Sequence, residues 1–142
     1  MSIANSSRSL AAVAMLAAAF GAGAARAAEH FDSAPTRAQL EQRFAELRAA
    51  KTLHVDRRLR WEYRFTSPDM RALESFSLLL VADDYKIATL LPPRAGEPAA
   101  VLRVVRVEQL TPASLEQRSA ELRRRATAQG VTYDGVDVGR EH

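Results

Sequence analysis

Few residues in this chain are of types that could catalyse a reaction or bind a metal ion. There is no cysteine, which excludes disulfides, thiolate metal sites and cysteine nucleophiles. The three histidines, His30, His54 and His142, are too far apart for one helix or strand to present two of them to a metal. Because a zinc site needs three or four converging ligands, we expect no metal site, and the sequence indicates no cofactor.

Motifs for hydrolysis and nucleotide binding are also missing. The sequence contains no Gly-x-Ser-x-Gly, no Walker phosphate loop and no Gly-x-Gly-x-x-Gly. A hydrolytic triad would have to use His54 as its base, and nothing in the sequence supports that role. The adjacent acids Asp83 and Asp84 fall where a predicted helix ends, which favours a helix terminus over acid–base chemistry. The sequence therefore predicts no catalytic residues and a protein that is not an enzyme.

An arginine-rich strand is the best candidate for a binding site. In residues 57–65, large apolar side chains alternate with charged ones, which predicts a strand with its aromatic residues on the buried side. The charged residues would share an open sheet face with two arginines of a neighbouring strand, and the expected face consists of Arg58, Arg60, Glu62, Arg64, Arg103 and Arg106. Such a face could bind phosphate or a carboxylate-rich partner, or it could be a solvated, ion-paired surface. Nucleic acid is not the favoured partner, because sheets that bind RNA stack bases on exposed aromatic side chains.

The order of predicted elements decides how that face is built. Residues 28–35 are expected to be a flexible lead, and the capping box that starts at Thr36 predicts a helix over residues 37–51. Strand, helix, strand, strand, helix and strand follow, at residues 57–65, 68–82, 85–91, 100–110, 112–129 and 131–138. Ser67 is the expected N-cap of the helix over residues 68–82, with Pro68 at its first position. This order predicts an α+β domain of the ferredoxin-like βαββαβ type. It would have a four-stranded antiparallel sheet, two helices on one face and one extra N-terminal helix.

The first 27 residues have the three-part pattern of a signal peptide. Arg8 supplies a positive charge, and residues 10–20 are an apolar run too short to span a membrane. A small-residue segment then fits the cleavage pattern between Ala27 and Ala28, with a second match that ends at Ala24. Cleavage after Ala27 would leave 115 of the 142 residues and lower the net charge from +3 to +1. We expect a periplasmic or secreted bacterial envelope protein that does not stay inserted in the membrane.

Residues near the C-terminus resemble a known family. The run Leu110-Thr111-Pro112, Leu115, Leu122 and Gly130-Val131-Thr132-Tyr133-Asp134-Gly135 is similar to the regulator of ribonuclease activity B family, whose domain ends in a helix and a Tyr-Asp-Gly strand. The resemblance covers residues 55 to 138. The chain differs at Val136, where the family usually has Trp, and at Asp84, where it usually has Gly. The resemblance implies a ferredoxin-like fold and a non-enzymatic role, because the family's named member binds ribonuclease E in the cytoplasm and inhibits it.

The expected export conflicts with inhibition of ribonuclease E, because an exported protein cannot meet a cytoplasmic ribonuclease. Either the fold serves a new purpose in the envelope, or residues 1–27 are not a signal. We expect the first, with residues 1–27 as signal, 28–54 as lead and helix, and 55–142 as the domain. The expected function is protein binding or regulation, and the alternative is an RNA or anionic-ligand binder. Tyr133, Asp134 and Gly135 are expected to be structural, with Tyr packed, Asp capping a turn and Gly permitting a bulge.

Overall fold

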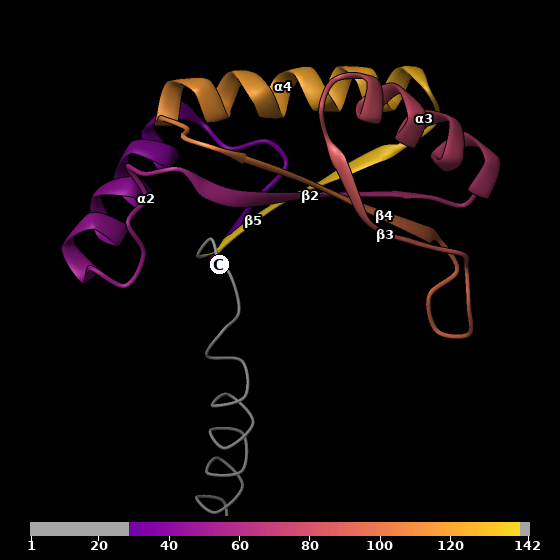
Figure 1. Cartoon of the computed structure of the whole chain (residues 1–142), viewed down its shortest axis with the longest axis horizontal. Coiled ribbons are helices and arrows are strands. Elements are labelled where there is room, and N and C mark those ends of the chain that lie inside the picture. Colours follow the sequence, from indigo (N-terminus) through magenta and orange to yellow (C-terminus); the bar gives the residue numbers. More distant parts are fainter. Residues whose placement is uncertain (1–28, 140–142) are drawn as a thin grey trace, which may run out of the picture.

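The computed structural model describes residues 29–139, which form an α+β fold (Figure 1). The expected signal segment, its cleavage positions Ala27 and Ala28, and His142 lie outside the described residues. The elements in chain order are β1 (Glu29–Phe31), α2 (Arg37–Ala50), β2 (Leu59–Ser67), α3 (Met70–Ala82), β3 (Lys86–Leu91), β4 (Ala100–Glu108), α4 (Pro112–Ala128) and β5 (Thr132–Gly139). The predicted α+β class, with antiparallel strands and a helix before β2, is confirmed.

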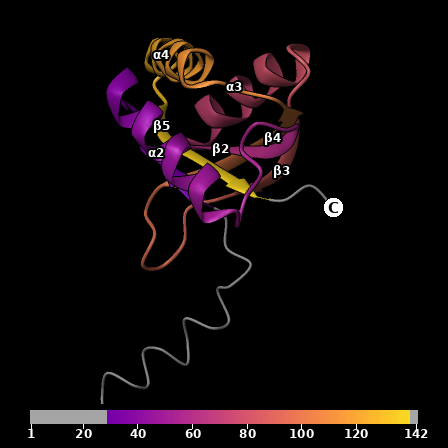
Figure 2. The same cartoon turned by 90° about the vertical axis from the view of Figure 1, so that its left-hand side faces the viewer.

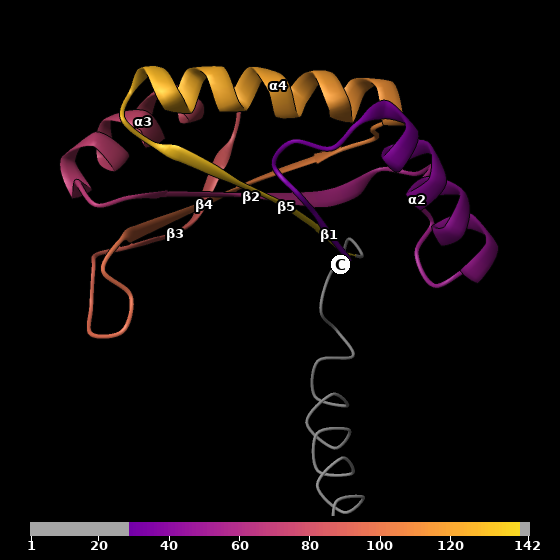
Figure 3. The same ribbon diagram turned by 180° about the vertical axis from the view of Figure 1, so that it is seen from behind.

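The sheet within residues 29–139 has five strands in the order β1-β5-β2-β4-β3, and every neighbouring pair is antiparallel. Helices α3 and α4 lie on one face, and α2 lies at the end of the sheet where α4 begins (Figures 1 and 2). The prediction of four strands was wrong, because the expected flexible lead contains β1. Three residues are too few to show an alternating pattern, and β1 forms because it pairs with β5, beside which it lies in Figure 3.

The N-cap residue of α2 is the one that the sequence predicts, whereas the N-cap residue of α3 differs from the prediction. The Thr36 hydroxyl accepts from the Gln39 amide, and the Gln39 side chain accepts in return from the Thr36 amide, which confirms the predicted capping box. Helix α3 is capped by Asp69, although the sequence favoured Ser67. Ser67 is instead the buried last residue of β2, where its hydroxyl donates to the Gly130 carbonyl.

Aromatic side chains on the inner face of β2 form the centre of the core. Trp61, Tyr63 and Phe65 are completely buried, as their alternation predicts. The Phe31 ring of β1 lies 6.1 Å from Trp61, and the Phe76 ring of α3 lies 5.0 Å from Phe65. Tilted and edge-on contacts at such distances add to the free energy gained by burial. Strand β1 and helix α2 therefore share one core with the rest of the described residues.

A partly buried ion pair joins α4 to the sheet. The Arg118 guanidinium donates to both carboxylate oxygens of Glu108, at 2.6 and 2.8 Å, and to the Tyr63 hydroxyl at 2.8 Å. The indole nitrogen of Trp61 donates to the Glu108 carbonyl at 3.0 Å. Burial by itself would raise the pKa of Glu108, but the hydrogen bonds and charge of Arg118 outweigh it and hold that pKa below its usual value. Burial raises the pKa of Tyr63 well above its usual range, so its hydroxyl stays protonated.

Replacing Arg118 with Ala should therefore destabilise the fold strongly. The two side chains of the pair are only 16% and 17% exposed, so the change leaves the partly buried Glu108 carboxylate without its cation. We expect a loss of about 3 kcal/mol in urea unfolding at pH 7. Arg124→Ala is the matched control, because Arg124 is an exposed arginine of the same helix, and it should cost less than about 0.5 kcal/mol.

The cost of Arg118→Ala should also depend on pH. The pKa of Glu108 is lowered in the folded state, so the pair stabilises the protein fully above the unfolded pKa near 4.5. Its contribution is lost as the pH falls through the folded value. The difference between wild type and variant should shrink as the pH falls below about 4.5, and a constant difference would contradict this electrostatic account.

Candidate binding surfaces

The arginine row of β2 lies on the sheet face that α3 and α4 leave uncovered. Arg58 and Arg60 are exposed, and Arg64 stands opposite Arg103 of β4, which places Arg103 on the same face. Arg106 does not belong to this face, and that prediction was wrong. Its cross-strand partner is Trp61, and its guanidinium lies 5.1 Å from the Tyr85 ring on the helix side. Residues 103 and 106 are three apart, so a period of two sends them to opposite faces.

Most charges on this face already have partners. Glu62 pairs with Arg60 at 3.5 Å and with Arg103 at 3.3 Å. Arg64 pairs with Asp134 of β5, and Arg58 donates to the Val107 carbonyl at 3.2 Å. An anionic ligand would have to compete with carboxylates that are already in place. The geometry therefore favours an ion-paired surface over a phosphate-binding site.

The Tyr133-Asp134-Gly135 segment forms a bulge in β5. The register changes between Arg64, which pairs with Gly135, and Phe65, which pairs with Tyr133, so Asp134 has no partner in the ladder. Tyr133 is buried 5.2 Å from the Phe65 ring, while Asp134 points outward to Arg64 rather than capping a turn. Burial raises the pKa of Tyr133 above its usual range.

Gly135 is required at this bulge for two reasons. Its φ is +114°, which side-chain-bearing residues rarely adopt. A Cβ would also lie 2.6 Å from the Phe31 carbonyl oxygen and 2.8 Å from His30 Cε1. The bulge therefore provides the space in which β1 docks.

His30 lies on β1 and holds that strand to β5. Its Nδ1 is 2.7 Å from Asp137 Oδ1, and its Nε2 is 3.7 Å from Asp32. A His–Asp pair can serve as the base half of a hydrolytic site, but the side chains recorded at both ring nitrogens are carboxylates rather than a nucleophile. No group of three or more His, Asp or Glu within residues 29–139 could hold a metal ion, and His54 lies apart, exposed in the loop before β2.

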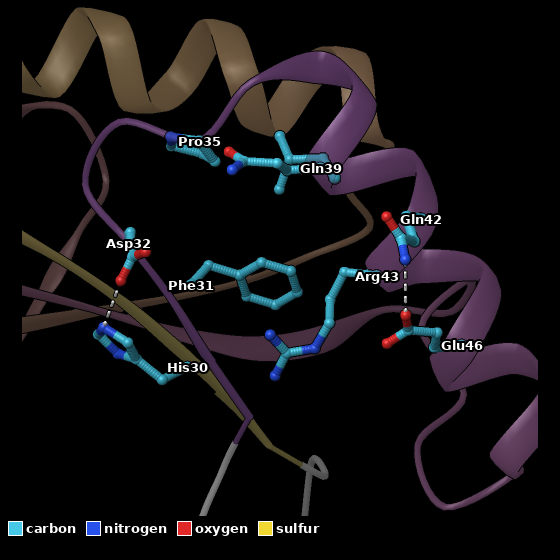
Figure 4. Close-up of a pocket in the computed structure, with 9 residues that line it drawn as sticks. His30, Phe31, Asp32, Pro35, Gln39, Gln42, Arg43 and Glu46 are labelled. Atoms are coloured by element: carbon cyan, nitrogen blue, oxygen red, sulfur yellow. Dashed lines mark hydrogen bonds and ion pairs between the residues drawn. The ribbon is translucent and has the colours of Figure 1, made fainter.

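A hollow of about 330 Å³ separates β1 from α2 (Figure 4). Phe31 and Arg43 lie in its middle, and Arg43 reaches across to Glu29, where it donates at 2.7 Å. The other polar groups of its α2 wall are engaged within the helix, since Gln39 caps Thr36 and Gln42 donates to Glu46. These side chains are committed to each other, so the hollow presents no unused donor set to a ligand.

Exposed apolar side chains gather at the opposite end of the sheet. The large hydrophobic residues recorded as exposed in residues 29–139 are Leu78, Leu79 and Val81 of α3 and Ile87 and Leu91 of β3. Leu78 is 69% exposed. Strand β3 is an edge strand, and five of its six residues are exposed. Leu91 pairs with Val101 on the arginine face of the sheet, and Leu79 lies roughly 40° around α3 from Asp83, on the flank that faces α4. We therefore call Leu78, Val81 and Ile87, together with the free edge of β3, the α3–β3 surface.

Sequence reasoning missed this surface, although a signal was present. Residues 78–81 are four consecutive apolar residues, and a helix cannot turn all four toward one core. Only Leu80 of the four is buried. An unbroken apolar run in an amphipathic helix therefore indicates a second apolar face.

No model of a known protein family matches the chain, and no curated protein matches it. No helix within residues 29–139 is long and apolar enough to cross a membrane. The resemblance to the regulator of ribonuclease activity B family stays a prediction.

Replacing Gly135 with Ala tests the role of the bulge. Gly96→Ala is the matched control, because Gly96 also has a positive φ, of +83°, but no atom within 4 Å of its missing Cβ. The control should cost about 1–2 kcal/mol of unfolding free energy. Gly135→Ala should cost more and should speed amide hydrogen exchange in residues 29–31, because its Cβ collides with β1. Equal costs with unchanged exchange would show that the close approach of β1 is unimportant.

Proposed function

We propose that this protein is a non-enzymatic, exported protein-binding module whose partner docks on the α3–β3 surface. The observation that carries the proposal is the clustering of exposed large hydrophobic side chains on two adjacent elements. Contiguous apolar patches on soluble domains mark interaction sites. A free strand edge beside the patch adds backbone donors and acceptors that a second strand can pair with.

We also propose that the domain is ferredoxin-like. Strands β5-β2-β4-β3, with α3 and α4 as the two crossing helices, agree with a βαββαβ unit. Strand β1 then extends the sheet at one edge, and α2 is the additional helix. A ferredoxin-like fold supports a distant relation to the regulator of ribonuclease activity B family, with a partner other than ribonuclease E.

Export is part of the same proposal. Residues 1–27 have the composition of a signal peptide, and β1 begins at Glu29. Cleavage between Ala27 and Ala28 would therefore leave every described element intact. The arginine face is the weaker binding candidate, because Glu62 and Asp134 already pair with its arginines.

The contact surface can be tested with Leu78→Ser combined with Val81→Ser. Both side chains are largely exposed, so the double variant should fold with a change in unfolding free energy of less than about 1 kcal/mol. Its affinity for a saturably bound partner protein should fall at least about ten-fold, since each buried aliphatic side chain contributes about 1.5–3 kcal/mol. Calorimetric titration with the purified partner measures the effect.

The triple variant Arg58→Ala, Arg60→Ala, Arg64→Ala is the control for the other face. It should bind that partner as wild type does. If it loses binding while the Leu78, Val81 variant keeps it, the arginine face is the site. Salt-titrated binding of single-stranded RNA to both variants then separates an anionic ligand from a protein partner.

Export makes a separate prediction. Fractionation should find the protein in the envelope, and N-terminal sequencing should start at Ala28, or at Ala25 if the second cleavage pattern is used. A cytoplasmic protein that keeps its first residues would contradict the export proposal and restore a cytoplasmic ribonuclease as a candidate partner.

A further inference from the structure

One flank of α3 points beyond the edge of the sheet. Asp83, at the C-terminus of α3, bonds Arg125 of α4 at 2.7 Å and so marks the flank that faces α4. At 100° per residue, Leu78 and Val81 lie roughly 140–160° around the helix from Asp83. They therefore point away from α4, on the side of α3 where β3 forms the sheet edge. Ile87 continues this apolar flank on β3 and is 43% exposed.

We propose that the occupant of the α3–β3 surface is a second copy of this chain, related by a two-fold axis, with the two β3 strands paired antiparallel. The proposal rests on the proposed function and names the partner. A two-fold interface brings the same patch of both subunits together, so it must be self-complementary. The α3–β3 surface meets that requirement. The free edge of β3 can pair with the same edge of the other copy, and the apolar flank of α3 can pack against the same flank.

Charges along β3 favour this pairing. If the two strands are centred on each other, Lys86 stands opposite Leu91 of the other copy, Ile87 opposite Leu90, and Ala88 opposite Thr89. No like charges are opposed within the strand. Just beyond it, the acids at 83 and 84 come level with residues 93 and 94 of the other copy.

In this register Asp84 is level with Pro93 of the other copy, next to Arg94, and both Asp84 and Arg94 are available for a new ion pair. Asp84 is exposed, and the structure records no ion pair or side-chain hydrogen bond for it. Arg94 has a single long ion pair, to Glu97 at 3.5 Å. Two symmetric contacts between Asp84 and Arg94 would thus flank the joined strands.

The same geometry explains why assembly would stop at two copies. Pairing uses the β3 edge of each copy and leaves the two β1 strands as the outer edges of the joined sheet. Strand β1 has three residues and carries Glu29 and His30. Short, charged edges resist further pairing. The bulge at Ala88 twists the β3 edge, which disfavours unrelated strands more than an identically twisted copy.

A charge swap across the two copies tests this arrangement. The native, processed protein should elute with twice the chain mass in size-exclusion chromatography with light scattering. Asp84→Lys alone and Arg94→Glu alone each place like charges at both flanking contacts, and each should weaken self-association on the order of ten-fold. In a mixture of the two variants both contacts become attractive, so a mixed dimer should form at wild-type affinity.

Rescue by mixing cannot arise within one chain, because Asp84 and Arg94 lie at opposite ends of β3. A wild-type protein that stays monomeric at several hundred micromolar, or a mixture that shows no preference for the mixed dimer, overturns the proposal. If the protein is monomeric and the Leu78, Val81 double variant still loses a different partner, the proposed function stands and only the second copy is wrong. If neither self-association nor partner binding responds to these changes, both proposals fail.

Discussion

The division of β2 into an aromatic face and a charged face is the constraint on which the rest of the structure depends. Strand β2 lies between β5 and β4, so its inner side chains must be covered by helices. Trp61 and Tyr63 bring a buried N–H and O–H that need partners, and burying such groups unpaired is costly. Glu108 accepts from both side chains. Its carboxylate in turn requires Arg118, which fixes where α4 crosses the sheet.

The other side of the same strand shows why charge alone is a poor guide to a binding site. Each charged residue of β2 has an oppositely charged partner, either on the same strand or on a neighbouring one, so the row is largely neutralised in place. The exposed apolar side chains of α3 are not covered in a comparable way, because no element of the described chain packs on the outer flank of this helix. The contrast between the two surfaces is the reason for placing partner binding on the second.

Local sequence signals were enough for the regular elements and failed where tertiary contacts decide. Alternation placed Trp61 and Arg60 on opposite faces of β2, and the Thr36 capping box located the start of α2. Strand β1 was not predictable, since three residues become a strand only through pairing with β5. Arg106 shows a different failure. Its type suggested the charged face, while its position in a period-two strand already required the helix side.

The free energy available from burying apolar side chains, rather than any reactive group, is the argument for a role of the α3–β3 surface in binding. Fully burying one aliphatic side chain is worth about 1.5–3 kcal/mol, and folding leaves Leu78, Val81 and Ile87 substantially exposed. The stabilisation that these residues can provide is obtained only on association. Association must offset the lost freedom of two bodies, which costs about 4–15 kcal/mol, so the apolar patch needs the added hydrogen bonds of a strand edge. Strand β3 supplies that edge directly beside the patch, which is why we propose a partner that engages both.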